Sequence, residues 1–239
     1  LHATQCVNCQ QPLLTYILRE TELDRAAMQG WPNVIALSQS TTLNHVVRHL
    51  DIVDRGNQQY VVLEDVARNT PQPITKVPTP CSPILALGWC TNLAQALVEL
   101  HRQGLTFQPS DPIAKFDGPI WRESILVINQ AANFADLTVT RRMIPGEDMP
   151  ALMKKDIAFL GWLFRWLLAG RSNAQTASLN IHPALQEIVK KVNSRAYRAA
   201  QEFLDDLSRV QIADVAPTRS LRQTTGYTTS VGMVREANE

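Results

Sequence analysis

Apolar and polar positions divide the chain into a mixed first part and a helical second part. The run YVVLEDV at 60–66 is short and rich in β-branched residues, which predicts a buried strand. Farther along, apolar residues recur at steps of four, four and three, which predicts an amphipathic helix over 87–104 that ends at Gly104. These residues are Trp89, Leu93, Leu97 and Leu100.

A proline-rich segment lies between the predicted strand and the predicted helix. Neither a helix nor a central strand persists through closely spaced prolines, so we expect the boundary between two lobes here. The prolines are Pro71, Pro73, Pro78, Pro80 and Pro83.

The second part continues with a predicted hairpin and three predicted helices. We expect strands at 123–128 and 133–139, joined by the polar stretch NQAA. The run at 157–169 is apolar on nearly every side, which predicts a buried central helix. One-sided apolar stripes at 183–192 and 196–209 predict helices that cover a core. The predicted fold class is α+β.

Composition narrows the classes of function. The chain has 239 residues and a formal net charge of +1, so no overall field attracts nucleic acid or an anionic membrane, and we expect neither as a partner. The most apolar run is too short to span a bilayer and contains Arg165. With no secretory signal and four cysteines that do not form a disulfide scaffold, we expect a cytoplasmic protein.

Four strings follow one another in the order of the predicted elements. They are NHVVRHLDIVDRGNQQYVVLEDV, LVELHRQG, DIAFLGWLFRWLLAGR and AYRAAQEFLDDL. This order resembles the eukaryotic-type protein kinase fold over residues 13–210, where the strings look like the segment leading to the hinge, the helix before the catalytic loop, the central helix and the last helix. The resemblance implies a two-lobed fold, with a reduced β-containing N-lobe at 13–70 and a mainly helical C-lobe at 71–212.

The catalytic loop that this resemblance implies lacks the residues that active kinases use for proton transfer. In active kinases a His-Arg-Asp triplet follows the glycine that corresponds to Gly104, and its Asp accepts the proton of the substrate hydroxyl. The matching residues are Phe107, Gln108 and Pro109, none of which is a base. Asp111 would reach the same place only if the proline-containing backbone around it rearranged.

The groups for metal and nucleotide binding are also reduced. The family's magnesium-binding Asn corresponds to Ser124, a poorer ligand, whereas the Asp of the Asp-Phe-Gly motif is retained as Asp136. No lysine precedes Lys76 to neutralise phosphate charge, and the two glycines before it, Gly30 and Gly56, cannot form a glycine-rich loop. We therefore expect no cofactor, and in particular no ATP with magnesium.

Scaffold groups of the family are retained where catalytic groups are lost. Asp156 lies at the start of the central helix, where the family uses the carboxylate to hold backbone amides of the catalytic loop. The Ala-Pro-Glu glutamate has no clear counterpart in residues 143–155, and its partner arginine corresponds to Ala196, so no buried charge is left unpaired. This pattern is typical of a pseudokinase.

The end of the chain resembles part of another enzyme. After Ile212 we expect a linker and then, within 213–239, the string TTSVGMVREANE, which closely resembles the first strand of PPM-family metal-dependent serine/threonine phosphatases. The Asp that follows this strand in the family coordinates the active-site metals. Because the chain also starts at Leu1 and not at Met, we expect a segment of a longer protein with a phosphatase downstream. An unrelated β-rich tail is the alternative.

Two cysteines near the start have the spacing of one zinc knuckle. They are Cys6 and Cys9, but a structural zinc site needs four ligands, and Cys81 and Cys90 are not spaced as a second knuckle. Residues 1–12 are either the remnant of a zinc ribbon or a stretch with two unpaired thiols, and we favour the thiols.

Two functions from different classes follow from these observations. We favour a non-enzymatic, kinase-like domain that acts as a regulatory or interaction module, either on the downstream phosphatase domain of the same parent chain or on another protein partner. The alternative is an unorthodox ATP-dependent serine/threonine protein kinase that uses Asp136 for magnesium and Asp111 as the base. A scaffold without regulatory effect is a third interpretation.

Overall fold

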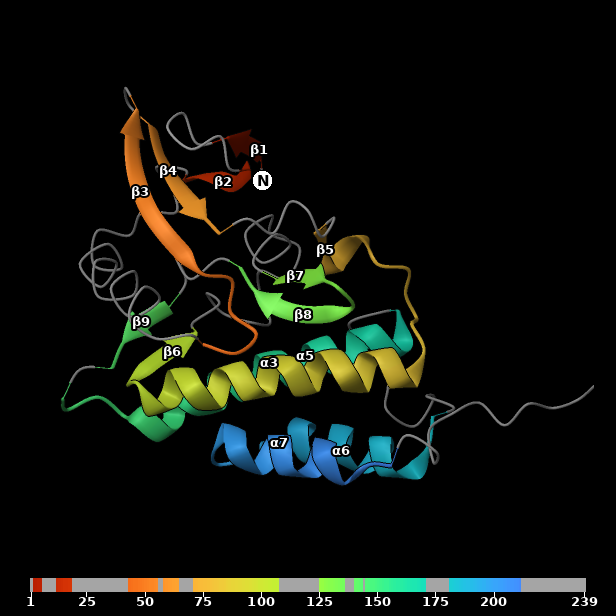
Figure 1. Cartoon of the computed structure of the whole chain (residues 1–239). Coiled ribbons are helices and arrows are strands. Elements are labelled where there is room, and N and C mark those ends of the chain that lie inside the picture. Colours follow the sequence, from red (N-terminus) through yellow and green to blue (C-terminus); the bar gives the residue numbers. More distant parts are fainter. Residues whose placement is uncertain are drawn as a thin grey trace, which may run out of the picture.

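A computed structural model describes residues 2–5, 12–18, 43–55, 58–64, 71–107, 125–135, 140–143, 145–170 and 181–211. Within these residues the structure is mixed α+β, with three small sheets and four α-helices. The largest sheet lies at one end of the molecule and the helices lie at the other, with the two smaller sheets between them (Figure 1). The predicted α+β class is therefore confirmed.

The largest sheet has four antiparallel strands in the order β1-β2-β4-β3. The strands are β1 (His2–Gln5), β2 (Pro12–Leu18), β3 (His49–Arg55) and β4 (Gln58–Leu63). The strand that the sequence predicts at 60–66 is β4, although it begins and ends earlier than the apolar run. The resemblance also implies a second strand within residues 44–66, and β3 lies there. Strands β1 and β2 were not predicted.

The first long helix, α3 (Pro83–Arg102), matches the predicted amphipathic helix but begins four residues earlier. Its start is fixed by Ser82, whose hydroxyl oxygen accepts a hydrogen bond from the backbone amide of Leu85 at 3.3 Å. A proline occupies the first helical position, where no intrahelical amide bond is lost. The helix ends before Gly104, which adopts a positive φ of 73°.

The predicted hairpin is present with different bounds. Strands β7 (Ile125–Ile128) and β8 (Ala131–Phe134) are joined by only two residues, Asn129 and Gln130. Their φ values of 49° and 67° suit the tight turn that matches the twist of antiparallel strands. The predicted start of the second strand at 133 was therefore wrong, because the turn takes two residues and not four, while residues 136–139 lie outside the described residues.

Two short strand pairings were not predicted. Strand β5 (Gln72–Pro73) pairs with β7 and is followed by the short 3-10 helix η3 (Ile74–Lys76). Strand β6 (Leu105–Phe107) follows α3 and pairs with β9 (Thr140–Arg142). The second pairing brings the end of the first long helix next to the chain that leads into the central helix.

The remaining helices are α5 (Met149–Ala169), α6 (Pro183–Asn193) and α7 (Ala200–Arg209). Helix α3 contacts α5, α7 and β8, and α5 contacts α6, so α3 and α5 form the centre of the core, as Figure 1 shows. Both α5 and α7 differ from their predicted starts at 157 and 196. No helix in the part of the chain that the structure describes is long and apolar enough to cross a membrane.

Candidate functional site

The end of β6 is the point at which the resemblance places the catalytic loop. Phe107, the last residue of this strand, is 1% exposed. Its ring centroid lies 4.4 Å from that of Phe134 on β8 and 5.5 Å from that of Phe159 on α5. The side chain of Phe107, which the resemblance aligns with the family's histidine, is therefore a core residue that joins the hairpin to the central helix.

A single buried carboxylate holds the backbone at this point. Asp156 on α5 is fully buried, and its Oδ2 accepts a hydrogen bond from the backbone amide of Phe107 at 2.9 Å. The Nε2 of His101, in the last turn of α3, lies 2.9 Å from the same oxygen. Because an ionised carboxylate only accepts hydrogen bonds, the imidazole donates in this contact. One oxygen atom thus connects α3, β6 and α5.

The other oxygen of this carboxylate has a different environment. The Oδ1 of Asp156 is buried and has no hydrogen-bond partner within the described residues. Burial raises the pKa of Asp156 from 3.8 to about 6. The hydrogen bond and charge of His101, the amide of Phe107 and the charge of Lys155 lower this pKa, but they do not offset burial. The pKa of this carboxyl group is therefore raised overall.

Sequence reasoning identified Asp156 through the resemblance but missed His101. A signal was present, because His101 is four residues after Leu97 and so lies on the apolar face of α3. Its side chain is only 7% exposed. A polar side chain on the buried face of a helix needs a hydrogen-bond partner, which points to the carboxylate.

A second set of hydrogen bonds attaches the chain before β3 to the β7–β8 hairpin and to α3. The amide of Val47 donates to the carbonyl of Phe134 at 2.7 Å, and the amide of Phe134 donates to the carbonyl of His45 at 2.9 Å. The ring of His45 also contacts the side-chain amide of Asn92 on α3 at 3.2 Å. His49, at the start of β3, is fully buried, and burial lowers its pKa to about 4 despite a hydrogen bond to the carbonyl of Val47.

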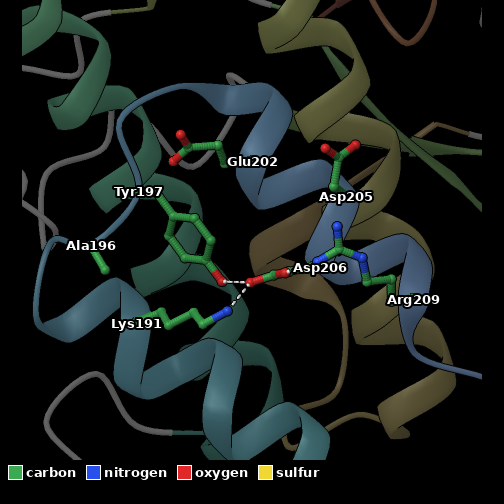
Figure 2. Close-up of a pocket in the computed structure, with 7 residues that line it drawn as sticks. All are labelled: Lys191, Ala196, Tyr197, Glu202, Asp205, Asp206 and Arg209. Atoms are coloured by element: carbon green, nitrogen blue, oxygen red, sulfur yellow. Dashed lines mark hydrogen bonds and ion pairs between the residues drawn. The ribbon is translucent and has the colours of Figure 1, made fainter.

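A hollow of about 290 Å³ lies between α6 and α7 (Figure 2). At its centre Asp206 accepts hydrogen bonds from Lys191 at 2.7 Å, Tyr197 at 2.9 Å and Arg209 at 3.0 Å. Burial works against ionisation of Asp206, but these donors and the two positive charges outweigh it, so its pKa is below the usual value. The exposed Ala196, which the resemblance aligns with the family's buried arginine, also lines the hollow. Glu202 and Asp205 complete the lining.

The other predicted site residues lie outside the described residues. They are Gln108, Pro109, Asp111, Ser124, Asp136, Cys6 and Cys9. The described ranges contain no group of three His, Cys, Asp or Glu side chains that could hold a metal ion. Cys81 and Cys90 carry free thiols, and burial raises the pKa of each. Comparison of the chain with models of known protein families and with curated proteins finds no match.

Proposed function

We propose that this chain is a catalytically inactive protein-kinase-like domain that acts as a regulatory or interaction module. The observation that carries the proposal is the hydrogen bond from the Phe107 amide to Asp156. A buried carboxylate holds the backbone where an active kinase begins its catalytic triplet, yet the first side chain is packed in the core and the next two residues are Gln108 and Pro109. The supporting group is present, whereas the triplet has no side chain that can take the substrate's proton.

The order of the described elements supports the two-lobed form of this fold. Strand β4 is followed by the proline-rich segment, α3, β6, the β7–β8 hairpin, α5 and then α6 and α7, which is the order that the resemblance implies. In this proposal the four-stranded sheet belongs to the N-lobe and the helices belong to the C-lobe (Figure 1). The hydrogen bonds of residues 45–47 with Phe134 would then hold the two lobes together.

The distribution of charge argues against phosphoryl transfer. Transfer requires cations and backbone amides around the phosphates, because negative charge is spread over their oxygens in the transition state. The first lysine of the chain is Lys76, on η3 beyond the proposed N-lobe, and its side chain is exposed. Before it the sequence has only two glycines, so neither the lysine nor the glycine-rich loop of an active kinase is available.

The partner we propose is a PPM-family phosphatase that follows this domain in the parent protein. The string TTSVGMVREANE supports it, because its Val-Gly, Arg-Glu and Asn-Glu pairs match the start of that family's first strand. This string lies outside the described residues. The test is to compare phosphatase activity of the parent protein with and without residues 1–212. A change in either direction supports regulation, and equal activity would favour a scaffold without regulatory effect.

The alternative, an unorthodox kinase, is favoured by one observation. Asp136 directly follows Ala135, which is buried at the end of the β7–β8 hairpin, and this is where the family's Asp-Phe-Gly motif begins. Thermal denaturation with ATP and magnesium would separate the two functions. Our proposal predicts no nucleotide-dependent increase in melting temperature, whereas an increase that Asp136→Asn abolishes, and that the exposed Asp148→Asn leaves intact, would favour the kinase.

A further inference from the structure

The junction around Asp156 connects three elements through one oxygen atom. His101 comes from the end of α3, the Phe107 amide from the end of β6, and the carboxylate from α5. These groups are almost completely removed from solvent, since the side chains of Asp156 and His101 are 0% and 7% exposed. If the junction opens, the carboxylate gains water and the Phe107 amide loses its partner. Closure of the junction is therefore linked to the charge on the carboxylate.

The direction of this linkage follows from burial. In the closed junction the ionised carboxylate lacks water, and two hydrogen bonds to Oδ2 replace only part of its hydration. The folded-state pKa of Asp156, about 6, lies above the ordinary value of 3.8 that an opened, hydrated carboxylate would have. The closed junction therefore binds a proton more tightly than the open one, so closure is favoured as pH falls through this range and disfavoured as pH rises.

We propose that Asp156 is a proton-dependent clasp: uptake of a proton from solvent closes the junction of α3, β6 and α5, and release of the proton lets the end of β6 separate from α5 more readily. The proton binds to Oδ1, the oxygen without a partner among the described residues, so Oδ2 keeps both of its hydrogen bonds. The regulatory meaning of the clasp rests on the proposed function, in which Phe107 takes the first position of the kinase triplet. The clasp itself does not.

The charged neighbours of Asp156 do not account for its raised pKa. His101 from α3 and Lys155 from α5 itself both favour the ionised form. Strand β6 has no titratable side chain, because its residues are Leu105, Thr106 and Phe107. Helices α6 and α7 also pack against α5, but Lys191 and Arg209 on these helices are paired with Asp206. Asp156 is therefore the group to follow in a titration.

Nuclear magnetic resonance of the whole chain tests the clasp directly. The carboxyl carbon of Asp156 reports its protonation, and hydrogen exchange of the Phe107 amide, expressed as a protection factor, reports opening of the junction after correction for the intrinsic effect of pH on exchange. We expect the carboxyl resonance to titrate with a midpoint near pH 6. The protection factor should be about tenfold higher at pH 5 than at pH 7.5, which is the ratio that pKa values of about 6 in the closed junction and 3.8 in the open one give over this range.

Two variants on the same helix provide matched controls. Asp148→Asn changes an exposed carboxylate that caps α5, and because Asn caps helices as well as Asp does, the pH dependence should stay as in the wild type. Asp156→Asn should make the protection of Phe107 nearly independent of pH. The wild-type measurement decides the matter even if Asp156→Asn does not fold.

Two outcomes would overturn the clasp: a carboxyl midpoint near 4, or a midpoint near 6 with equal protection of Phe107 at both pH values. The measurement needs neither nucleotide nor phosphatase. A failed titration would therefore leave the proposed function standing, and a nucleotide-binding or phosphoryl-transfer result against the proposed function would leave the clasp standing.

Discussion

Replacement of Gly161 by alanine tests the packing of the central helix. Gly161 lies on α5 where this helix contacts α6, and it is buried. A Cβ atom built on Gly161 would overlap three side-chain atoms of Val192, namely Cβ, Cγ1 and Cγ2. Val192 is 8% exposed and is β-branched, so it has few alternative rotamers to move into. The absence of a side chain at Gly161 is therefore what allows the two helices to approach.

The size of the effect follows from two opposing contributions. Insertion of a methyl group into a packed core costs about 1–3 kcal/mol. Replacement of glycine by alanine within a helix contributes about 1 kcal/mol of stability, because glycine loses more backbone freedom on folding. Gly161→Ala should therefore change the free energy of unfolding by between zero and about −2 kcal/mol.

A matched variant isolates the steric contribution. Gly88 on α3 is exposed, and a Cβ atom there would meet nothing within 4 Å, so Gly88→Ala should stabilise the chain by about 0.5–1 kcal/mol. Urea denaturation of both variants gives the free energies of unfolding. The difference between the two free energies should be about 1–3 kcal/mol. The cost of Gly161→Ala should be smaller when it is measured in a Val192→Ala background, because the side chain that the new methyl group meets is then shorter. Equal stabilisation by the two single substitutions would refute the close approach of α5 and α6.

Three further predictions concern polar groups. Asp206→Asn removes the acceptor of three hydrogen bonds and should lower the free energy of unfolding at pH 7 by only about 1 kcal/mol, because the cationic partners are partly screened by solvent. Since the folded-state pKa of Asp206 is lowered, this loss should diminish in urea titrations as the pH falls below about 4. The pKa of Asp156 is raised, so wild-type stability relative to Asp156→Asn should fall by about 2 kcal/mol between pH 4 and pH 7 in the same assay. Trp89→Phe removes the hydrogen bond to the carbonyl of Gln130 at 2.8 Å and should cost about 1 kcal/mol, seen as a lower urea midpoint.

The sequence predicted elements best where one face of a helix is apolar. Helices α3 and α6 have such a stripe, and both were predicted within a few residues. The start of α5 was missed because its first turns are set by the side chain of Asp148, which accepts a hydrogen bond from the amide of Ala151, and not by the apolar run. The pairing of β6 with β9 joins two strands of three residues each, which are too short to show an alternating pattern.

The candidate site was predictable in part for a similar reason. The sequence shows that Phe107, Gln108 and Pro109 stand where the resemblance implies a His-Arg-Asp triplet, and the resemblance singled out Asp156. The sequence did not predict the contact of His101 with Asp156, because this contact joins residues 55 positions apart on two packed helices. A raised pKa also depends on how completely the group is removed from water, which a pattern of residue types does not determine.

Phosphoryl transfer is the most direct test of the proposed function. Purified chain is incubated with γ-labelled ATP, magnesium or manganese, and a general protein substrate, beside the Asp136→Asn variant prepared in the same way. We predict no label above background in the chain or in the substrate, because the first 75 residues contain no lysine to hold the phosphates and the triplet at Phe107 has no base. Label that the wild-type chain incorporates, and that Asp136→Asn does not, would contradict the account.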